Sequence, residues 1–168
     1  MSKRFLLALI LSTAATAQVR LDEYAVKAAF LYNFSKFVDW PPSKDPFAIC
    51  VLGRNPFGQS LEQILEGKTI ENRPLAVREI SEVDNSSHCQ IVFISSSEQK
   101  QLVPIIAGVA GTGALTVGDT PGFAEKGGVV NLALEGGRVH IEINLEAARQ
   151  QNLRISSKLL SLARIVKN

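Results

Sequence analysis

Three short, largely apolar runs place the tightest limit on how this chain can fold. They cover residues 47–52, 91–95 and 114–117, and none is long enough for an ordinary helix. Runs of this length, bounded by turn residues, are typical of strands buried on both faces, as in a parallel sheet. Segments with helical spacing lie between them. The chain is therefore predicted to form a layered α/β domain.

Two further strands are predicted at residues 129–134 and 138–143, joined by Glu135-Gly136-Gly137. A glycine pair at this position favours a tight hairpin, which makes the sheet mixed but mainly parallel, with helices on its flanks. Thr69–Ile80 is expected to be extended, as an edge strand or hairpin. The expected helices are Leu21–Trp40, Gln59–Leu65, Glu98–Ala107, Leu145–Gln150 behind an Asn144 cap, and Ser156–Lys167 with Leu159, Ala163 and Val166 as its packing face.

Residues 1–17 have the three parts of a secretory signal peptide. Lys3 and Arg4 form a charged start, Phe5–Leu11 an apolar centre, and Ala15-Thr16-Ala17 a small-residue cleavage site. The apolar centre is too short to span a bilayer. We therefore expect cleavage before Gln18, export to a bacterial periplasm, and one mature domain covering residues 18–168.

Cleavage also changes the charge of the chain. Of its 18 basic residues, Lys3 and Arg4 are lost, and the rest balance the 16 acidic residues. A mature net charge near zero, without a basic cluster, argues against nucleic acid as a partner. Two cysteines in an exported chain favour one disulfide between Cys50 and Cys89, although two buried thiols remain an alternative.

No assembled catalytic, metal or cofactor site is recognisable. The turn Gly53–Gly58 lies where a phosphate-binding loop would, but Gln59 replaces the required lysine. A zinc site built from His88, Cys89 and His140 has only a weak signal. We therefore expect no catalytic residues, no metal and no cofactor, and favour a protein that is not an enzyme.

One strand has a polar face that could bind a ligand. Arg138, His140 and Glu142 alternate with apolar residues and so share one face, which is either an ordinary solvent-exposed face or part of a site. Arg154 lies shortly after and could bring a guanidinium group near Glu142. We expect these two side chains to be within reach of each other.

Six segments together resemble the YfiR-like family of bacterial periplasmic regulators, almost from end to end. They are residues 24–34 (YAVKAAFLYNF) with Phe37-Val-Asp-Trp-Pro41, Gly53–Gly58, residues 89–94 (CQIVFI), residues 115–119 (LTVGD) with Gly122-Phe123 and Gly127-Gly128, residues 141–144 (IEIN), and residues 153–160 (LRISSKLL). Each segment is weak alone, but their common order is specific.

The resemblance implies a non-enzymatic inhibitor that forms dimers. Such proteins bind the periplasmic domain of an inner-membrane diguanylate cyclase, lower its cyclic-di-GMP output, and release it under envelope or redox stress. Cys50 and Cys89 match one family disulfide, whereas a second pair is missing. A small anionic or nucleotide-like ligand site would map onto Glu142, Asn144 and Arg154. Ser156 and Asp39 replace a histidine and an arginine that can occur there.

The first predicted helix supplies candidate partner-binding residues, because its aromatic side chains exceed what one core-facing stripe absorbs easily. The alternative is that all five pack inward. A second function also stays open, that of an exported solute-binding or small-ligand module without inhibitory activity. The aromatic residues are Tyr24, Phe30, Tyr32, Phe34 and Phe37.

Overall fold

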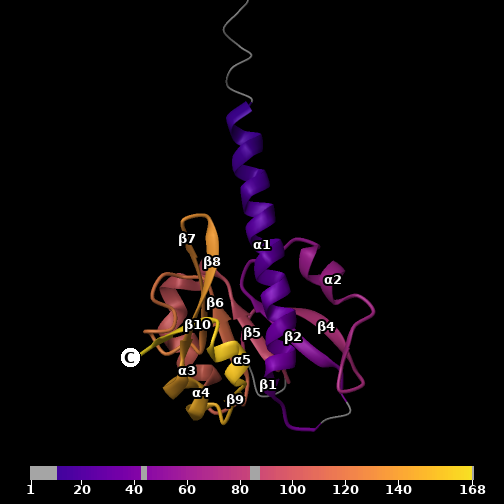
Figure 1. The fold of residues 1–168 in the computed structure, drawn as a ribbon, viewed down its shortest axis with the longest axis vertical. Coiled ribbons are helices and arrows are strands. Elements are labelled where there is room, and N and C mark those ends of the chain that lie inside the picture. Colours follow the sequence, from indigo (N-terminus) through magenta and orange to yellow (C-terminus); the bar gives the residue numbers. More distant parts are fainter. Residues whose placement is uncertain (1–10, 43–44, 84–87, 168) are drawn as a thin grey trace, which may run out of the picture.

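The sequence forms a mixed, mostly parallel eight-stranded sheet with helices on both faces (Figure 1). The computed structural model describes the backbone of residues 11–42, 45–83 and 88–167, and side chains from Glu23 onward. The elements in chain order are α1 Leu11–Phe37, β1 Val38–Asp39, β2 Phe47–Leu52, α2 Ser60–Leu65, β3 Thr69–Ile70, β4 Arg73–Ile80, β5 Ile91–Ile94, the 3-10 helix η1 Ser96–Gln101, α3 Leu102–Val109, β6 Leu115–Gly118, β7 Val130–Glu135, β8 Arg138–Asn144, α4 Leu145–Gln150, β9 Arg154–Ile155, α5 Ser157–Leu160 and β10 Ala163–Val166.

The strand order across the large sheet is β10-β8-β7-β6-β5-β2-β4-β3. The central strands β4, β2, β5, β6 and β7 run parallel, while hairpins reverse β3 and β8. β10 then runs parallel to β8. The prediction of a mixed, mainly parallel sheet flanked by helices is confirmed, including the hairpin at Gly136 and Gly137.

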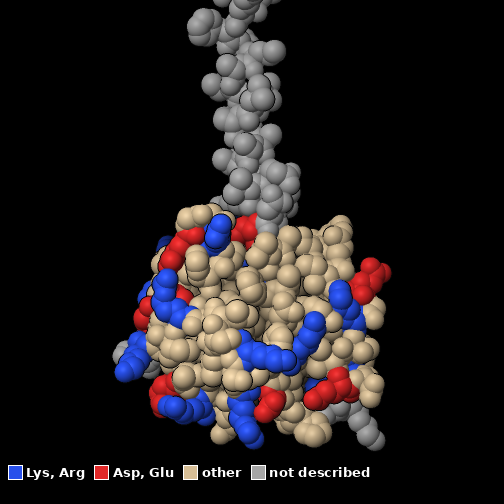
Figure 2. Space-filling view, viewed as in Figure 1, with Lys and Arg blue, Asp and Glu red and all other residues tan. Residues whose placement is uncertain are grey.

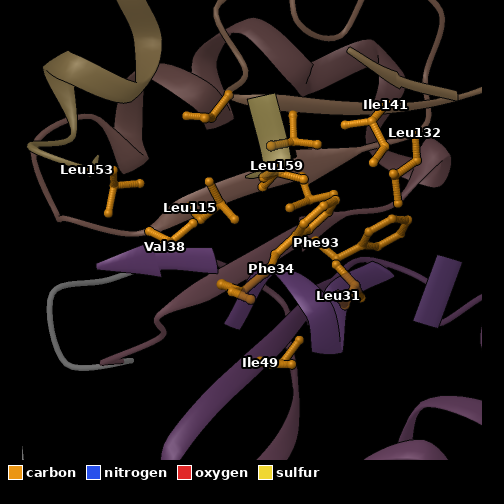
Figure 3. Close-up of a cluster of buried hydrophobic side chains, with 14 of the residues drawn as sticks. Leu31, Phe34, Val38, Ile49, Phe93, Leu115, Leu132, Ile141, Leu153 and Leu159 are labelled. Atoms are coloured by element: carbon orange, nitrogen blue, oxygen red, sulfur yellow. The ribbon is translucent and has the colours of Figure 1, made fainter. Parts of the chain in front are cut away.

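The central strands are buried on both faces, as their apolar composition predicts. Every residue of β2 and β5 is buried. Because side chains alternate along a strand, Ile49 faces the core that contains α1, whereas Cys50 faces the core that contains α3. Figure 3 shows the larger core, where Leu31 and Phe34 of α1 meet Phe93 of β5.

The first helix begins before the predicted start and ends before the predicted end. α1 is helical from Leu11 to Phe37, after which Val38 and Asp39 pair with β9 as a short second sheet. The expected signal peptide lies mainly outside the described residues, since residues 1–10 are not described and 11–17 form the start of α1. Among the described residues, no helix is long and apolar enough to cross a membrane.

The prediction of a helix over Ser156–Lys167 is wrong. α5 ends at Leu160, and Ala163–Val166 instead form β10, which pairs in register with Ile141–Asn144 of β8. The apolar spacing of this segment suits a helix locally, but Ile165 and Val166 are β-branched and also suit a strand. Pairing with the edge of β8 favours the strand over the helix.

Candidate functional site

The polar face of β8 exists, but it binds a different arginine from the one predicted. Arg138 and His140 are exposed, whereas Glu142 is buried at 7% exposure. Glu142 accepts hydrogen bonds from Asn131 Nδ2 at 2.7 Å and from Arg164 Nη1 at 3.0 Å. The charge of Glu142 and one lone pair on each of its carboxylate oxygens are therefore already matched within the chain.

The predicted contact between Glu142 and Arg154 is wrong. Arg154 lies in β9, opposite Asp39 of β1, and its Nε is 3.6 Å from the carboxylate of Asp39. Its side chain is 87% exposed. Arg164 takes the expected place beside Glu142 because β10 aligns it directly with that residue. Sequence reasoning missed Arg164 because it had placed this residue in a helix.

Arg164 also forms an exposed ion pair with Glu135 near the end of β7. Its Nη1 and Nη2 lie 3.2 and 3.3 Å from the two carboxylate oxygens. The hydrogen bond from Arg164, followed by its charge, lowers the pKa of Glu135, and the charge of His140 acts in the same direction. The hydrogen bond to Glu135 in turn raises the pKa of Arg164. This network ties β10 to β7 and β8.

Asn144, a predicted ligand residue, has a structural role. It is wholly buried and caps α4, with its Oδ1 accepting from the N–H of Ala147 at 2.9 Å. Its Nδ2 donates to the carbonyl oxygen of Ala124 at 2.8 Å. The predicted helix cap is confirmed. The predicted ligand residues therefore do not converge on one site, because Asn144 is buried in the fold and Arg154 pairs with Asp39.

The α1 helix contributes a buried polar cluster that sequence reasoning missed. Lys27 is 2% exposed and pairs with Glu23, one turn earlier, and with Asp119 Oδ2 at 2.7 Å. Tyr24 donates its hydroxyl hydrogen to the same Asp119 oxygen at 2.8 Å. Asp119 follows β6 directly, so the cluster joins α1 to the carboxyl edge of the sheet. A signal was present, since Lys27 falls on the helix face of buried Ala28, Leu31 and Phe34.

The turn after β2 is filled by side chains of its own chain. Phe57 is buried, and its ring packs against Tyr24 and Phe93 with centroids 5.5 and 4.8 Å apart. A Cβ on Gly53 would lie 2.5 Å from both Ser97 Oγ and Glu98 Oε1. An acidic side chain packed this closely disfavours an anion at this turn. The arrangement fits the interpretation of Gly53–Gly58 as a turn that ends a strand.

The predicted disulfide is present in the structure. Cys50 of β2 is bonded to Cys89, which precedes β5, and their Cα atoms are 5.9 Å apart. This separation lies in the range of about 4.4–6.8 Å that disulfides adopt. Cys89 is therefore not available for the zinc site considered with His88 and His140.

The aromatic residues of α1 divide between core and surface. Phe34 is wholly buried, so its assignment to a partner-binding surface is wrong, because it faces the sheet together with Leu31. Tyr24 is partly buried and bonded to Asp119. The ring of Tyr32 is covered by the ammonium groups of Lys36 and Lys68. Phe30 and Phe37 are partly buried rings that pack against the core, and the ring of Phe30 stacks on that of Phe34 with centroids 6.1 Å apart.

A partly exposed stripe of α1 consists of Val26, Phe30, Asn33 and Phe37. Their spacing of four, three and four residues places them along one side of the helix. Val26 is 45% exposed and the others are partly exposed. Figure 2 shows large uncharged areas on the face carrying α1, with Lys and Arg side chains crossing its middle and further charged side chains along its margin. We call these four residues the α1 stripe.

Comparison with known proteins identifies the family. The YfiR/HmsC-like family model matches residues 24–164, and no curated protein matches. A conserved domain protein from Vibrio cholerae O1 biovar El Tor aligns with a TM-score of 0.57 and 13% identity, over 86% of this chain and 60% of that one. The ABC domain from Streptococcus pneumonia in complex with L-Trp aligns with a TM-score of 0.52 and 8% identity, over 71% and 55%.

These structural similarities show the fold alone, and the chain spans little more than half the length of either protein. The family match runs from Tyr24 within α1 to Arg164, halfway along β10, and it includes the α1 stripe together with Lys27 and Asp119. The chain therefore belongs to the YfiR/HmsC-like family, whose members are regulatory proteins of the periplasm.

Proposed function

We propose that the mature chain is a non-enzymatic periplasmic regulator that binds and represses the sensing domain of an inner-membrane signalling protein of the diguanylate cyclase type. The family match over residues 24–164 carries this proposal. The signal-like residues 1–17 and the disulfide support action outside the cytoplasm.

The α1 stripe is the proposed contact surface. Val26 is exposed and Phe30 is partly exposed, on a helix that is anchored in the core through Leu31 and Phe34. A surface held this firmly loses little conformational freedom on binding. Exposed apolar and aromatic side chains are typical of the central part of protein interfaces.

The charge balance predicts how this complex responds to salt. The mature chain has a net charge near zero, so long-range attraction contributes little to association. We expect the dissociation constant to change less than about threefold between 50 and 500 mM salt, since screening acts mainly on charged surfaces.

A pull-down combined with a reporter tests the proposal. Tagged, exported protein should capture a membrane protein with a cyclase output domain, and deletion of its gene should raise a cyclic-di-GMP reporter. The matched control is a variant without residues 2–17, which should stay in the cytoplasm. This variant should therefore fail to restore repression in the deletion strain. Without a membrane partner and with an unchanged reporter, the regulatory proposal fails.

Small-ligand binding is a second candidate because the structure contains a suitable hollow. It has a volume of about 500 Å³ and is lined by Trp40, His88, Gln90, Gln151 and Leu153, among others. One structural neighbour is described in complex with L-Trp. Calorimetric titration with L-tryptophan and with a nucleoside monophosphate tests this candidate. A heat of binding that is present in the wild type and absent in Trp40→Ala would support ligand binding in this hollow. No heat with either compound would exclude both compounds as ligands.

A further inference from the structure

One aromatic ring of α1 is contacted by two ammonium groups from different elements. The Nζ atoms of Lys36 and Lys68 lie 3.9 and 5.0 Å from the ring centroid of Tyr32. Lys36 lies one turn after Tyr32 in α1, whereas Lys68 lies between α2 and β3. Because both nitrogens contact one ring, they are at most about 9 Å apart, within the Debye length of about 10 Å at 0.1 M salt. We call these three residues the Tyr32 cluster.

Neither ammonium group of the cluster is neutralised by a carboxylate in the part of the chain that the structure describes. The salt bridges found there use other cations, which are Lys27, Arg149, Arg154 and Arg164. Lys68 Nζ donates to the carbonyl oxygen of Ile64, which uses one of its three N–H bonds. The cluster therefore carries two positive charges and several N–H donors that remain available to an anion.

The hydroxyl group of Tyr32 is a further donor. Its ring is partly buried against the larger core, which fixes the position of the hydroxyl. The hydroxyl of Tyr24 donates to Asp119, but among the described residues no group forms a hydrogen bond with the hydroxyl of Tyr32. A tyrosine hydroxyl between water and two cations is well suited to donate to an anion.

The fold holds the two lysines near the ring before any ligand binds. The backbone N–H of Lys68 donates to Leu65 of α2 at 3.0 Å, and its carbonyl oxygen accepts from Leu75 of β4 at 3.2 Å. Side chains in a helix lean toward its amino end, so Lys36 is directed back over Tyr32. Donors that are positioned in advance lose less conformational freedom on binding.

We propose that the Tyr32 cluster binds a phosphoryl group, of inorganic phosphate or of a lipid headgroup. Two ammonium groups and one hydroxyl suit a tetrahedral anion with several acceptor oxygens, and lysine binds phosphate as a point charge. A planar carboxylate carries a single charge and is matched better by the fork of an arginine. The cluster shares no residue with the ligand set that the family resemblance implies, and the inference does not depend on the proposed regulatory function.

Tyrosine signals in nuclear magnetic resonance test the site in the full mature chain. The chain has two tyrosines, so ¹³C-labelled tyrosine gives a reporter at Tyr32 and an internal control at Tyr24, and Tyr32→Phe assigns the signals. Inorganic phosphate replaces sodium chloride at constant ionic strength. The Tyr32 signal should shift and saturate with a dissociation constant of about 1–10 mM, while the Tyr24 signal stays in place. Acetate should bind at least about threefold more weakly.

A double substitution links the shift to the two cations. Lys36→Gln/Lys68→Gln should weaken phosphate binding at least about tenfold, because it removes both charges. The matched control is Lys158→Gln, which changes an exposed lysine of α5 and should bind phosphate like the wild type. Unaltered affinity in the double variant, equal shifts of Tyr24 and Tyr32, or an equal loss of affinity in Lys158→Gln would each overturn the proposal.

Lipid vesicles distinguish the two sources of the phosphoryl group. If vesicles of phosphatidylglycerol sediment the protein and inorganic phosphate releases it, the ligand is a lipid headgroup. If phosphate shifts the Tyr32 signal but the vesicles leave the protein in solution, the ligand is soluble phosphate. Both results support the site. A Tyr32 signal that responds to neither probe would overturn it, and equal affinity for acetate and phosphate would overturn its assignment to a phosphoryl group.

Discussion

The two faces of the sheet are held by different kinds of chemistry. On the α1 face, the buried ion pair between Lys27 and Asp119 connects positions 92 residues apart. On the α3 face, the disulfide between Cys50 and Cys89 lies in the smaller apolar core. The ion pair depends on both partners in the folded state, whereas the disulfide acts largely by restricting the unfolded chain.

This difference predicts how each face fails. When Lys27 is removed, Asp119 remains a buried carboxylate, with its side chain 4% exposed and without its cation. When the disulfide is removed, small side chains remain in an otherwise complete apolar core. Substitution of Lys27 should therefore destabilise the protein more than loss of the disulfide, although the apolar core on the α1 face is the larger of the two.

The largest effect is expected for Lys27→Met, which keeps the length and apolar stem of the side chain. Loss of one partner from a buried ion pair should lower the free energy of unfolding by about 3–5 kcal/mol. Urea unfolding followed by circular dichroism measures it. The double variant Lys27→Met/Asp119→Asn removes both charges and should regain part of the loss. A single variant within 1 kcal/mol of the wild type would contradict the role of this pair.

A smaller effect is expected for Cys50→Ala/Cys89→Ala. The bond closes a loop with a sequence separation of 39 residues, for which the typical contribution is about 2–4 kcal/mol. The double variant should unfold at lower urea concentration than the oxidised protein. The control is wild type in reductant, which should lose a similar amount. If neither change lowers the midpoint, the disulfide does not stabilise the fold.

The smallest effect is expected at the exposed pair of Glu135 and Arg164. The pKa of Glu135 is lowered in the folded protein, so its contribution is present above the unfolded pKa and is lost as pH falls through the folded value. Glu135→Gln should therefore lower the urea midpoint slightly at pH 7, and the two midpoints should converge in acid, below the lowered pKa of Glu135. A constant difference at all pH values would mean that the charge of Glu135 is not responsible.

Features that depend on local sequence could be predicted before the structure was known. The strands β2 and β5 were predictable because a run such as Ile91–Ile94 is apolar throughout and too short for an ordinary helix. The disulfide was predictable because an exported chain with two cysteines has one possible pairing. The cap at Asn144 was predictable because it is a local signal.

Features that depend on distant partners were not predictable. The helical spacing places Lys27 on the face that α1 buries, but nothing local to α1 indicates that its partner is Asp119, 92 residues away. β10 has residues compatible with helix or strand, and the choice depends on β8. The expected approach of Arg154 to Glu142 failed for the same reason, because Arg164 came from a strand that local spacing did not reveal.

The measurement that tests the central claim most directly compares one substitution on the two faces. Val26→Glu places a charge in the α1 stripe, and Val103→Glu places the same charge on α3, where the valine is also exposed. The account predicts that Val26→Glu weakens capture of the membrane partner about tenfold or more and raises the cyclic-di-GMP reporter toward the deletion level, while Val103→Glu behaves as wild type. Full capture and full repression by Val26→Glu, in protein that unfolds like the wild type, would contradict the claim that α1 forms the regulatory surface.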